Sequence, residues 1–287
     1  MRFDWIEGAG LMKRIAIAII HGLGSEDEFY SVELKHRLSE EYVKGAKGRS
    51  EDELVFHEIY WGDLIKNDLV NFRNKANYKG DLAYQNLRQI MTDTQALALL
   101  YRPGSLLYDA INNRIKDGLR KLLSHRWVDG ETTPLVILAH SYGGVMMSHY
   151  IKKMKVSKVE RSNFEQLKTL AGYITFGNPM GLYAIDDTQT ELGVPCDIVG
   201  DALDEDFKLR ARWYNFYDKD DIIAYPLKGL SADYNLYVDG DFEINVGSAT
   251  TSWNPACHSG YWEDKDFYRP VATFIGELKA DHAIWQD

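Results

Sequence analysis

Short apolar runs alternate with segments of helical periodicity along most of the chain. Runs of this length, continuous rather than alternating, are typical of parallel strands buried on both faces. Parallel strands need crossover connections, and the intervening segments are long enough for helices. We therefore expect an α/β fold with a mostly parallel sheet of about six strands and helices on both faces. The predicted strands cover 14–20, 54–61, 134–139, 170–176 and 212–217.

Apolar residues recur at helical spacing between these strands, which predicts helices over 29–42, over 143–154 and after Asp264. Several helical pieces are expected within 62–130, broken at Arg102-Pro103-Gly104. This segment exceeds what one crossover helix needs, so we expect it to contain a helical cap over a site. Its candidate wall residues, which also suit ordinary helix packing, are Leu64, Tyr78, Tyr84, Leu97, Leu99, Leu100, Tyr101 and Tyr108, with further walls from the loop Met180 to Leu209.

Asp239-Gly240 lies between two apolar stretches, 236–238 and 242–246. An Asp-Gly pair in that setting favours a tight hairpin turn. We therefore expect an antiparallel hairpin near one edge of the sheet.

No repeat, low-complexity stretch or Pro/Gly-rich linker divides the chain, so 1–287 is expected to be a single domain. Residues 1–11 precede a second methionine, Met12, and are either an upstream extension or a segment that packs through Trp5 and Ile6.

Composition excludes several classes of function. The chain has 33 basic and 43 acidic residues, a formal charge of −10, which disfavours nucleic-acid partners and anionic lipid headgroups.

The apolar run 15–20 is too short to span a bilayer or to form the core of a signal peptide, so we expect no stable membrane insertion and a cytoplasmic protein. Cys196 and Cys257 are too few for a disulfide scaffold or a cysteine-rich zinc site and are expected to be structural. No cofactor or metal is expected.

The most informative segment is Leu138-Ala139-His140-Ser141-Tyr142-Gly143-Gly144. It follows a predicted buried strand and opens a predicted helix, and small residues flank Ser141 two positions away on each side. This is the pattern of a nucleophile elbow, with alanine at its first position. The sharp turn holds the serine in a strained conformation, and only small neighbours let strand and helix approach so closely. A glycine-rich turn without chemistry is the alternative.

A second segment, Ile20-His21-Gly22-Leu23-Gly24, ends the first predicted strand. Acyl transfer needs two N–H donors for the developing oxyanion, one from the residue after the nucleophile and one from a glycine-flanked loop after an earlier strand. The backbone N–H groups of Tyr142 and Leu23 are the candidates. The third glycine of a dinucleotide fingerprint is absent, which argues against that alternative.

The His-Gly-Leu-Gly strand end, the Ala-His-Ser-Tyr-Gly-Gly elbow and the His-Ser-Gly-Tyr-Trp run at 258–262 together resemble the α/β-hydrolase fold, in particular its lipase and esterase-like members. The resemblance extends from about residue 14 to residue 280. It implies the chain order serine, acid, histidine, with the acid just after the strand that follows Gly177-Asn178-Pro179.

The acid is then Asp218, Asp220 or Asp221, and comparison with acid loops of the family selects Asp220. The same order leaves His258 as the base. The other histidines precede the serine, flank it or the glycine turn, or lie in the tail. His149 follows Ser141 by eight residues, about 12 Å of helix rise, and is too far along its helix to reach it.

The sequence thus predicts a serine hydrolase of carboxylic esters that acts on a small-molecule acyl ester through Ser141, Asp220 and His258. An acyltransferase or a thioesterase would use the same groups, and a non-catalytic binding protein on this scaffold is the alternative from another class.

Overall fold

The computed structural model describes residues 14–23, 27–77, 80, 82–83, 85–185, 197–248, 251–252 and 255–279. Within them, six strands form one sheet in the order β2-β1-β3-β4-β5-β6, and every neighbouring pair is parallel. The chain is therefore an α/β protein, as the apolar runs predict. The strands are β1 (Ile15–Ile20), β2 (Leu54–Ile59), β3 (Leu135–His140), β4 (Leu170–Phe176), β5 (Arg212–Tyr217) and β6 (Gly240–Glu243).

Burial along the strands follows their place in the sheet. Every residue of β1, β3 and β4 is buried, whereas β2, β5 and β6 contain half-buried or exposed positions. The central strands can be apolar throughout because helices cover both of their faces. Since all the strands are parallel, their carboxyl ends meet at one edge, where the segments after β1, β3 and β5 come together.

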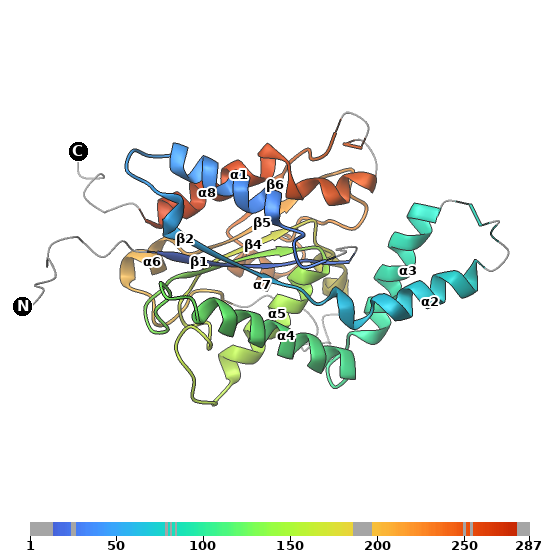
Figure 1. Cartoon of the computed structure of the whole chain (residues 1–287), viewed down its shortest axis with the longest axis horizontal. Coiled ribbons are helices and arrows are strands. Elements are labelled where there is room, and N and C mark those ends of the chain that lie inside the picture. The colour runs from blue at the N-terminus through green and yellow to red at the C-terminus, as the bar shows by residue number, and fades with distance from the viewer. Residues whose placement is uncertain are drawn as a thin grey trace, which may run out of the picture.

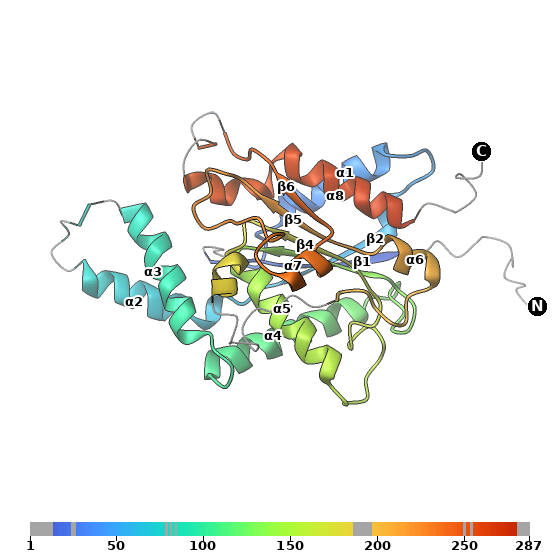
Figure 2. The same ribbon diagram turned by 180° about the vertical axis from the view of Figure 1, so that it is seen from behind.

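Helices cover both faces of the sheet (Figures 1 and 2). On one face α1 packs beside α8, and α4 and α5 lie on the other. Buried side chains of α8 recur three or four residues apart, so its apolar face is turned to the sheet. The bounds are α1 (Val32–Lys44), α4 (Leu106–Leu123), α5 (Tyr142–Val156) and α8 (Lys265–Leu278), with shorter helices α6 (Glu205–Arg210) and α7 (Ala232–Tyr237).

The long segment 62–130 divides into two parts. Its last helix, α4, packs on β1 and β2 and so belongs to a layer of the domain. The helices α2 (Lys66–Ala76) and α3 (Gln85–Leu100) instead form a pair that projects away from the sheet, on the right in Figure 1 and on the left in Figure 2. Among the main helices in the described part of the chain, this pair alone lies outside the layers.

The predicted antiparallel hairpin around Asp239-Gly240 is wrong. Residues 232–237 form α7, and Ser231 caps its N-terminus, since the Ser231 hydroxyl accepts the Tyr234 N–H. The strand β6 then pairs with β5 in parallel. The Asp239 carboxylate accepts the Trp213 N–H of β5 at 2.8 Å, which ties the turn to the neighbouring strand. The apolar residues that suggested a strand before the turn lie at the end of this short helix, in which Tyr234 is buried and Leu236 is exposed.

Several expectations lie outside the described residues. They concern residues 1–13, Tyr78, Tyr84 and 186–196, the last of which include Cys196 and the middle of the loop Met180 to Leu209. Among the residues that are described, every helix is too short or too polar to cross the apolar core of a bilayer.

Candidate active site

Ser141 lies at the turn between β3 and α5 with φ 53° and ψ −131°. A non-glycine residue rarely adopts this backbone conformation, and such strain persists only where surrounding structure enforces it. One part of that structure is the close approach of α5 to the end of β1, which Gly143 permits. A Cβ at Gly143 would lie 2.7 Å from the His21 carbonyl oxygen and 2.8 Å from that of Ile20. Only glycine lets the start of α5 approach the end of β1 so closely. The strained turn expected from the elbow motif is therefore present.

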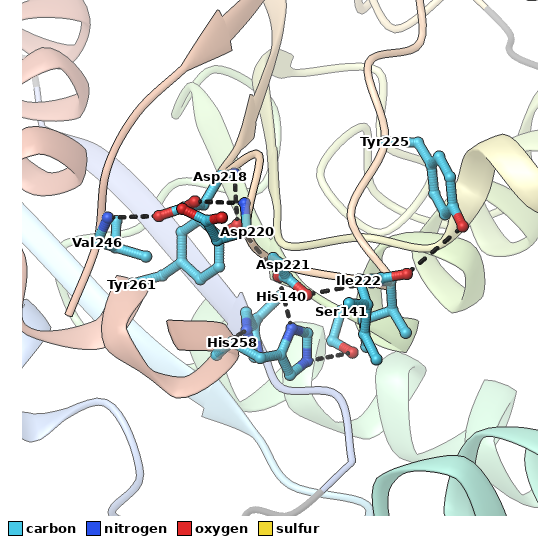
Figure 3. Close-up of polar contacts among 11 residues, drawn as sticks. His140, Ser141, Asp218, Asp220, Asp221, Ile222, Tyr225, Val246, His258 and Tyr261 are labelled. Carbon is cyan, nitrogen blue, oxygen red and sulfur yellow. Dashed lines mark hydrogen bonds and ion pairs between the residues drawn. The ribbon is translucent and has the colours of Figure 1, made fainter. Parts of the chain in front are cut away.

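The side chains of three distant segments meet at this turn (Figure 3). The Ser141 hydroxyl lies 3.1 Å from His258 Nε2, and His258 Nδ1 lies 2.8 Å from Asp221 Oδ2. A carboxylate only accepts hydrogen bonds, so Nδ1 carries the proton when the imidazole is neutral. Nε2 is then left to accept the hydroxyl proton of the serine. Such an arrangement can move a proton from Ser141 to His258 and hold the resulting charge beside Asp221.

The structure corrects the choice of acid. Asp221, not Asp220, contacts His258, and its side chain is buried with only 1% exposure. Asp220 is half-buried, and its N–H donates to Asp218 Oδ1 at 2.8 Å. Asp218 is also buried, but its other oxygen accepts the Val246 N–H at 2.7 Å. It therefore ties two loops together and lies away from the imidazole (Figure 3).

The turn that carries these acids explains the error. The Asp221 N–H donates to the Asp218 carbonyl at 3.1 Å, so the chain folds back within four residues. Asp221 Oδ1 accepts the Ile223 N–H at 3.2 Å, which leaves Oδ2 to face His258. Three acids within four residues look alike in sequence, and only the closure of this turn decides which one points inward.

Tyr261 links both buried acids. Its hydroxyl accepts the Asp218 N–H at 2.8 Å and donates to Asp221 Oδ2 at 3.2 Å. Burial, together with the nearby Asp221 charge, raises the pKa of this phenol well above its ordinary value, so it remains a donor. The Asp221 carboxylate thus accepts hydrogen bonds from an imidazole, a phenol and a backbone N–H. Sequence reasoning included Tyr261 only as part of the run at 258–262 and assigned it no role, although it lies three residues after His258.

His140 supports the backbone of His258. Its Nε2 lies 3.0 Å from the His258 carbonyl oxygen, which can only accept, so Nε2 is the protonated nitrogen. The two imidazole rings are 4.7 Å apart. Burial and the neighbouring His258 lower the pKa of His140 well below its ordinary value, so a neutral ring packs against the proposed base.

The loop after β1 lies directly against the serine. A Cβ on Gly22 would be 2.3 Å from Ser141 Cβ and 2.7 Å from its Oγ, so this approach requires glycine. Tyr142 is the first residue of α5, and N–H groups in a first helical turn have no intrahelical acceptor. Both segments predicted to supply oxyanion donors therefore adjoin Ser141. Gly24 lies outside the described residues.

His21 holds that loop in one orientation. Its Nδ1 donates to the Gly22 carbonyl at 2.5 Å, and its Nε2 accepts the Trp61 N–H at 3.0 Å. The Trp61 indole donates in turn to the His21 carbonyl at 2.8 Å. Burial lowers the pKa of His21 to about 4, which keeps the ring neutral. In a trans peptide the N–H points opposite the C=O. The Leu23 N–H is therefore directed away from the His21 ring.

The remaining candidates have structural surroundings. Cys257 is fully buried, and burial beside the nearby acids raises the pKa of its thiol to about 12, so it is no thiolate nucleophile. His149 is buried against Tyr101, and burial lowers its pKa to about 4. Of the predicted wall residues, Leu97 and Tyr101 are buried in the core, Leu64 and Tyr108 are partly buried against it, and Leu99 and Leu100 are exposed.

A cavity of about 330 Å³ opens beside the loop after β1. Gly22 and Leu23 line one part of it, and the rest is lined by residues of α2 and α3 and by Trp61, Gly62 and Ile65, which precede α2. Among the described residues, no group of three or more His, Cys, Asp or Glu side chains is placed to hold a metal ion.

Neither a protein-family model nor a curated protein matches this chain. The structure itself shows a parallel α/β fold with a hydrogen-bonded serine, histidine and aspartate at the carboxyl edge of its sheet.

Proposed function

We propose that this protein is a serine hydrolase of carboxylic esters with an α/β-hydrolase fold. The observation that carries the proposal is the continuous path from Ser141 Oγ through His258 to Asp221, with contacts of 3.1 Å and 2.8 Å. The strained serine at a strand-to-helix turn supports it. The order of the three residues in the chain is the order expected of that fold.

In the proposed reaction His258 Nε2 takes the Ser141 proton as Oγ attacks the acyl carbon. The carbonyl π electrons move to the oxygen, and the N–H groups of Leu23 and Tyr142 stabilise that oxyanion. Collapse of the tetrahedral intermediate breaks the ester bond, and His258 gives its proton to the departing alcohol. Water then attacks the acyl-enzyme through the same base, releasing the acid and restoring the serine.

The helices α2 and α3 are proposed to act as the cap of this site. They adjoin the cavity whose wall begins at Gly22, in contact with Ser141. A thioesterase or an acyltransferase would use the same serine and differ in leaving group or acceptor, so substrate profiling distinguishes them.

Labelling with a fluorophosphonate tests the nucleophile. The wild-type chain is expected to take up the probe and the Ser141→Ala variant to lose it. Ser157→Ala, at the other end of α5, is the matched control and should label normally. Cys257→Ser should also label, because its thiol is not the nucleophile. Labelling that survives Ser141→Ala would remove the proposed chemistry.

A further inference from the structure

The cavity beside the serine has a near end and a far end. Trp61 lines the near end, and its backbone and indole N–H groups bind the loop after β1, which lies against Ser141. Ile65, Leu69 and Arg73 follow at intervals of four residues, and all three line the cavity. Residues four apart lie on one face of a helix, so this wall rises about 12 Å from Ile65 to Arg73. The cavity therefore leads from the serine along one face of α2.

The wall changes its chemistry along this path. Ile65 and Leu69 are buried apolar residues. At the far end Arg73 meets Asp93 of α3, with its Nη1 2.5 Å and 2.7 Å from the two carboxylate oxygens. The exposed Lys66 also lines the cavity, but it lies next to Ile65, at the opposite end. The path is therefore apolar up to Leu69 and ends at an ion pair.

The two charges of the Arg73–Asp93 pair compensate each other, so the far end is polar without a net charge. The Asp93 side chain is 7% exposed and that of Arg73 is 29% exposed, so the carboxylate lies deep and the guanidinium keeps part of its contact with water. An alkyl group that covered the pair would remove this water and offer no hydrogen bond in return, which is costly. An alkyl chain therefore gains by extending along Leu69 and loses by extending over the pair.

We propose that the Arg73–Asp93 pair limits the length of the acyl chain, and that the substrates are esters of uncharged straight-chain acids. The inference rests on the proposed ester hydrolysis and adds the substrate class. A C–C bond is about 1.5 Å long, so an extended acyl chain of about eight carbons is about 9 Å long and fits the path of about 12 Å. A cavity of about 330 Å³ is near the lower limit of ligand pockets, which suits such a chain.

A series of esters tests the length limit. The series comprises the p-nitrophenyl esters of the even-numbered straight-chain acids from acetate to dodecanoate. The wild-type kcat/KM is expected to rise about tenfold for each two carbons up to hexanoate or octanoate, as burial of two methylenes supplies, and to be about tenfold or more below its maximum at dodecanoate. A kcat/KM that rises through dodecanoate, or that does not rise beyond acetate, would overturn the inference.

Variants assign the limit to the ion pair. Arg73→Met combined with Asp93→Leu replaces the pair by apolar side chains, a change that buried ion pairs often tolerate. The ratio of kcat/KM for decanoate to that for hexanoate should then rise about tenfold. Arg73→Met with Asp93→Asn should raise this ratio as well and takes the place of the first variant if that fails to fold. Arg120→Met with Glu165→Leu removes an ion pair of α4 outside the cavity and is the matched control, which should leave the ratio unchanged. A ratio that neither change at the pair raises would refute the assignment.

A binding experiment separates this inference from the proposed reaction. Calorimetry of methyl hexanoate, methyl octanoate and methyl decanoate with the Ser141→Ala variant needs no turnover. The affinity should stop rising by decanoate, whereas the addition of Arg73→Met and Asp93→Leu should raise the decanoate affinity about tenfold. That result supports the length limit even if the wild type cleaves no ester. Absence of binding, or an affinity that rises alike through decanoate in both proteins, overturns the limit even if the protein hydrolyses esters through Ser141.

Discussion

Replacing Asp221 by asparagine changes one oxygen of a buried carboxylate into an amide nitrogen and keeps the side-chain volume. Asp221 Oδ1 accepts the Ile223 N–H at 3.2 Å, so the amide oxygen is held on that side. The amide nitrogen then faces His258 Nδ1, 2.8 Å away in the native site, and donates to it. Nδ1 becomes an acceptor, the proton moves to Nε2, and Nε2 no longer accepts the Ser141 hydroxyl proton.

The expected loss is large because the substitution inverts the tautomer of the base. Asparagine in place of the acid of a serine triad lowers kcat about 10⁴-fold, or about 5 kcal/mol of barrier. We expect a loss of that order for Asp221→Asn with a p-nitrophenyl ester, at little cost in folding.

Two neighbouring variants serve as controls. Asp220→Asn should change kcat less than about threefold, because this half-buried residue contributes its N–H, not its carboxylate, to the network. Asp218→Asn removes an acceptor from one of two backbone donors and should cost about 1–3 kcal/mol of stability. If Asp220→Asn lost as much activity as Asp221→Asn, or if Asp221→Asn stayed within tenfold of wild type, the argument from this geometry would fail.

Three further predictions follow from contacts of the same site. Gly143→Ala places a methyl 2.7 Å from a backbone oxygen and should cost about 1–3 kcal/mol in urea unfolding, more than Gly144→Ala in the same helix, where a Cβ would lie 3.3 Å from its nearest neighbour; equal costs would contradict the clash. Tyr261→Phe removes one donor to Asp221 and should lower kcat several-fold with little change in KM; an altered KM at constant kcat would contradict a positioning role. Burial lowers the pKa of His21 and of His149 from 6.5 to about 4, so both bind a proton more readily when unfolded. Their stabilisation is complete above pH 6.5 and is lost as pH falls toward 4, by about 2 kcal/mol each at pH 5; unfolding free energies that are flat from pH 7 to 5 would refute this.

The sequence alone determined the layers of this protein and the place of its serine. Runs such as Ile15–Ile20 are apolar at every position, and a strand of that kind is stable only between two covering layers. Ser141 could be located because its turn needs small residues at fixed offsets, a local requirement that leaves a local pattern. His258 was reached through the chain order that the fold implies, and it does contact Ser141.

The tertiary structure decided what depends on orientation. Asp218, Asp220 and Asp221 have the same chemistry within four residues, and the turn closed by the Asp221 N–H on the Asp218 carbonyl selects Asp221. The sequence at Asp239-Gly240 is typical of a hairpin turn. In the structure the Trp213 N–H donates to Asp239, and the strand that follows pairs with β5 in parallel. The Tyr261 bridge and the Arg73–Asp93 pair join residues 20 to 43 positions apart. Such contacts exist only once the chain has folded, because no spacing in sequence fixes which side chains meet across separate elements.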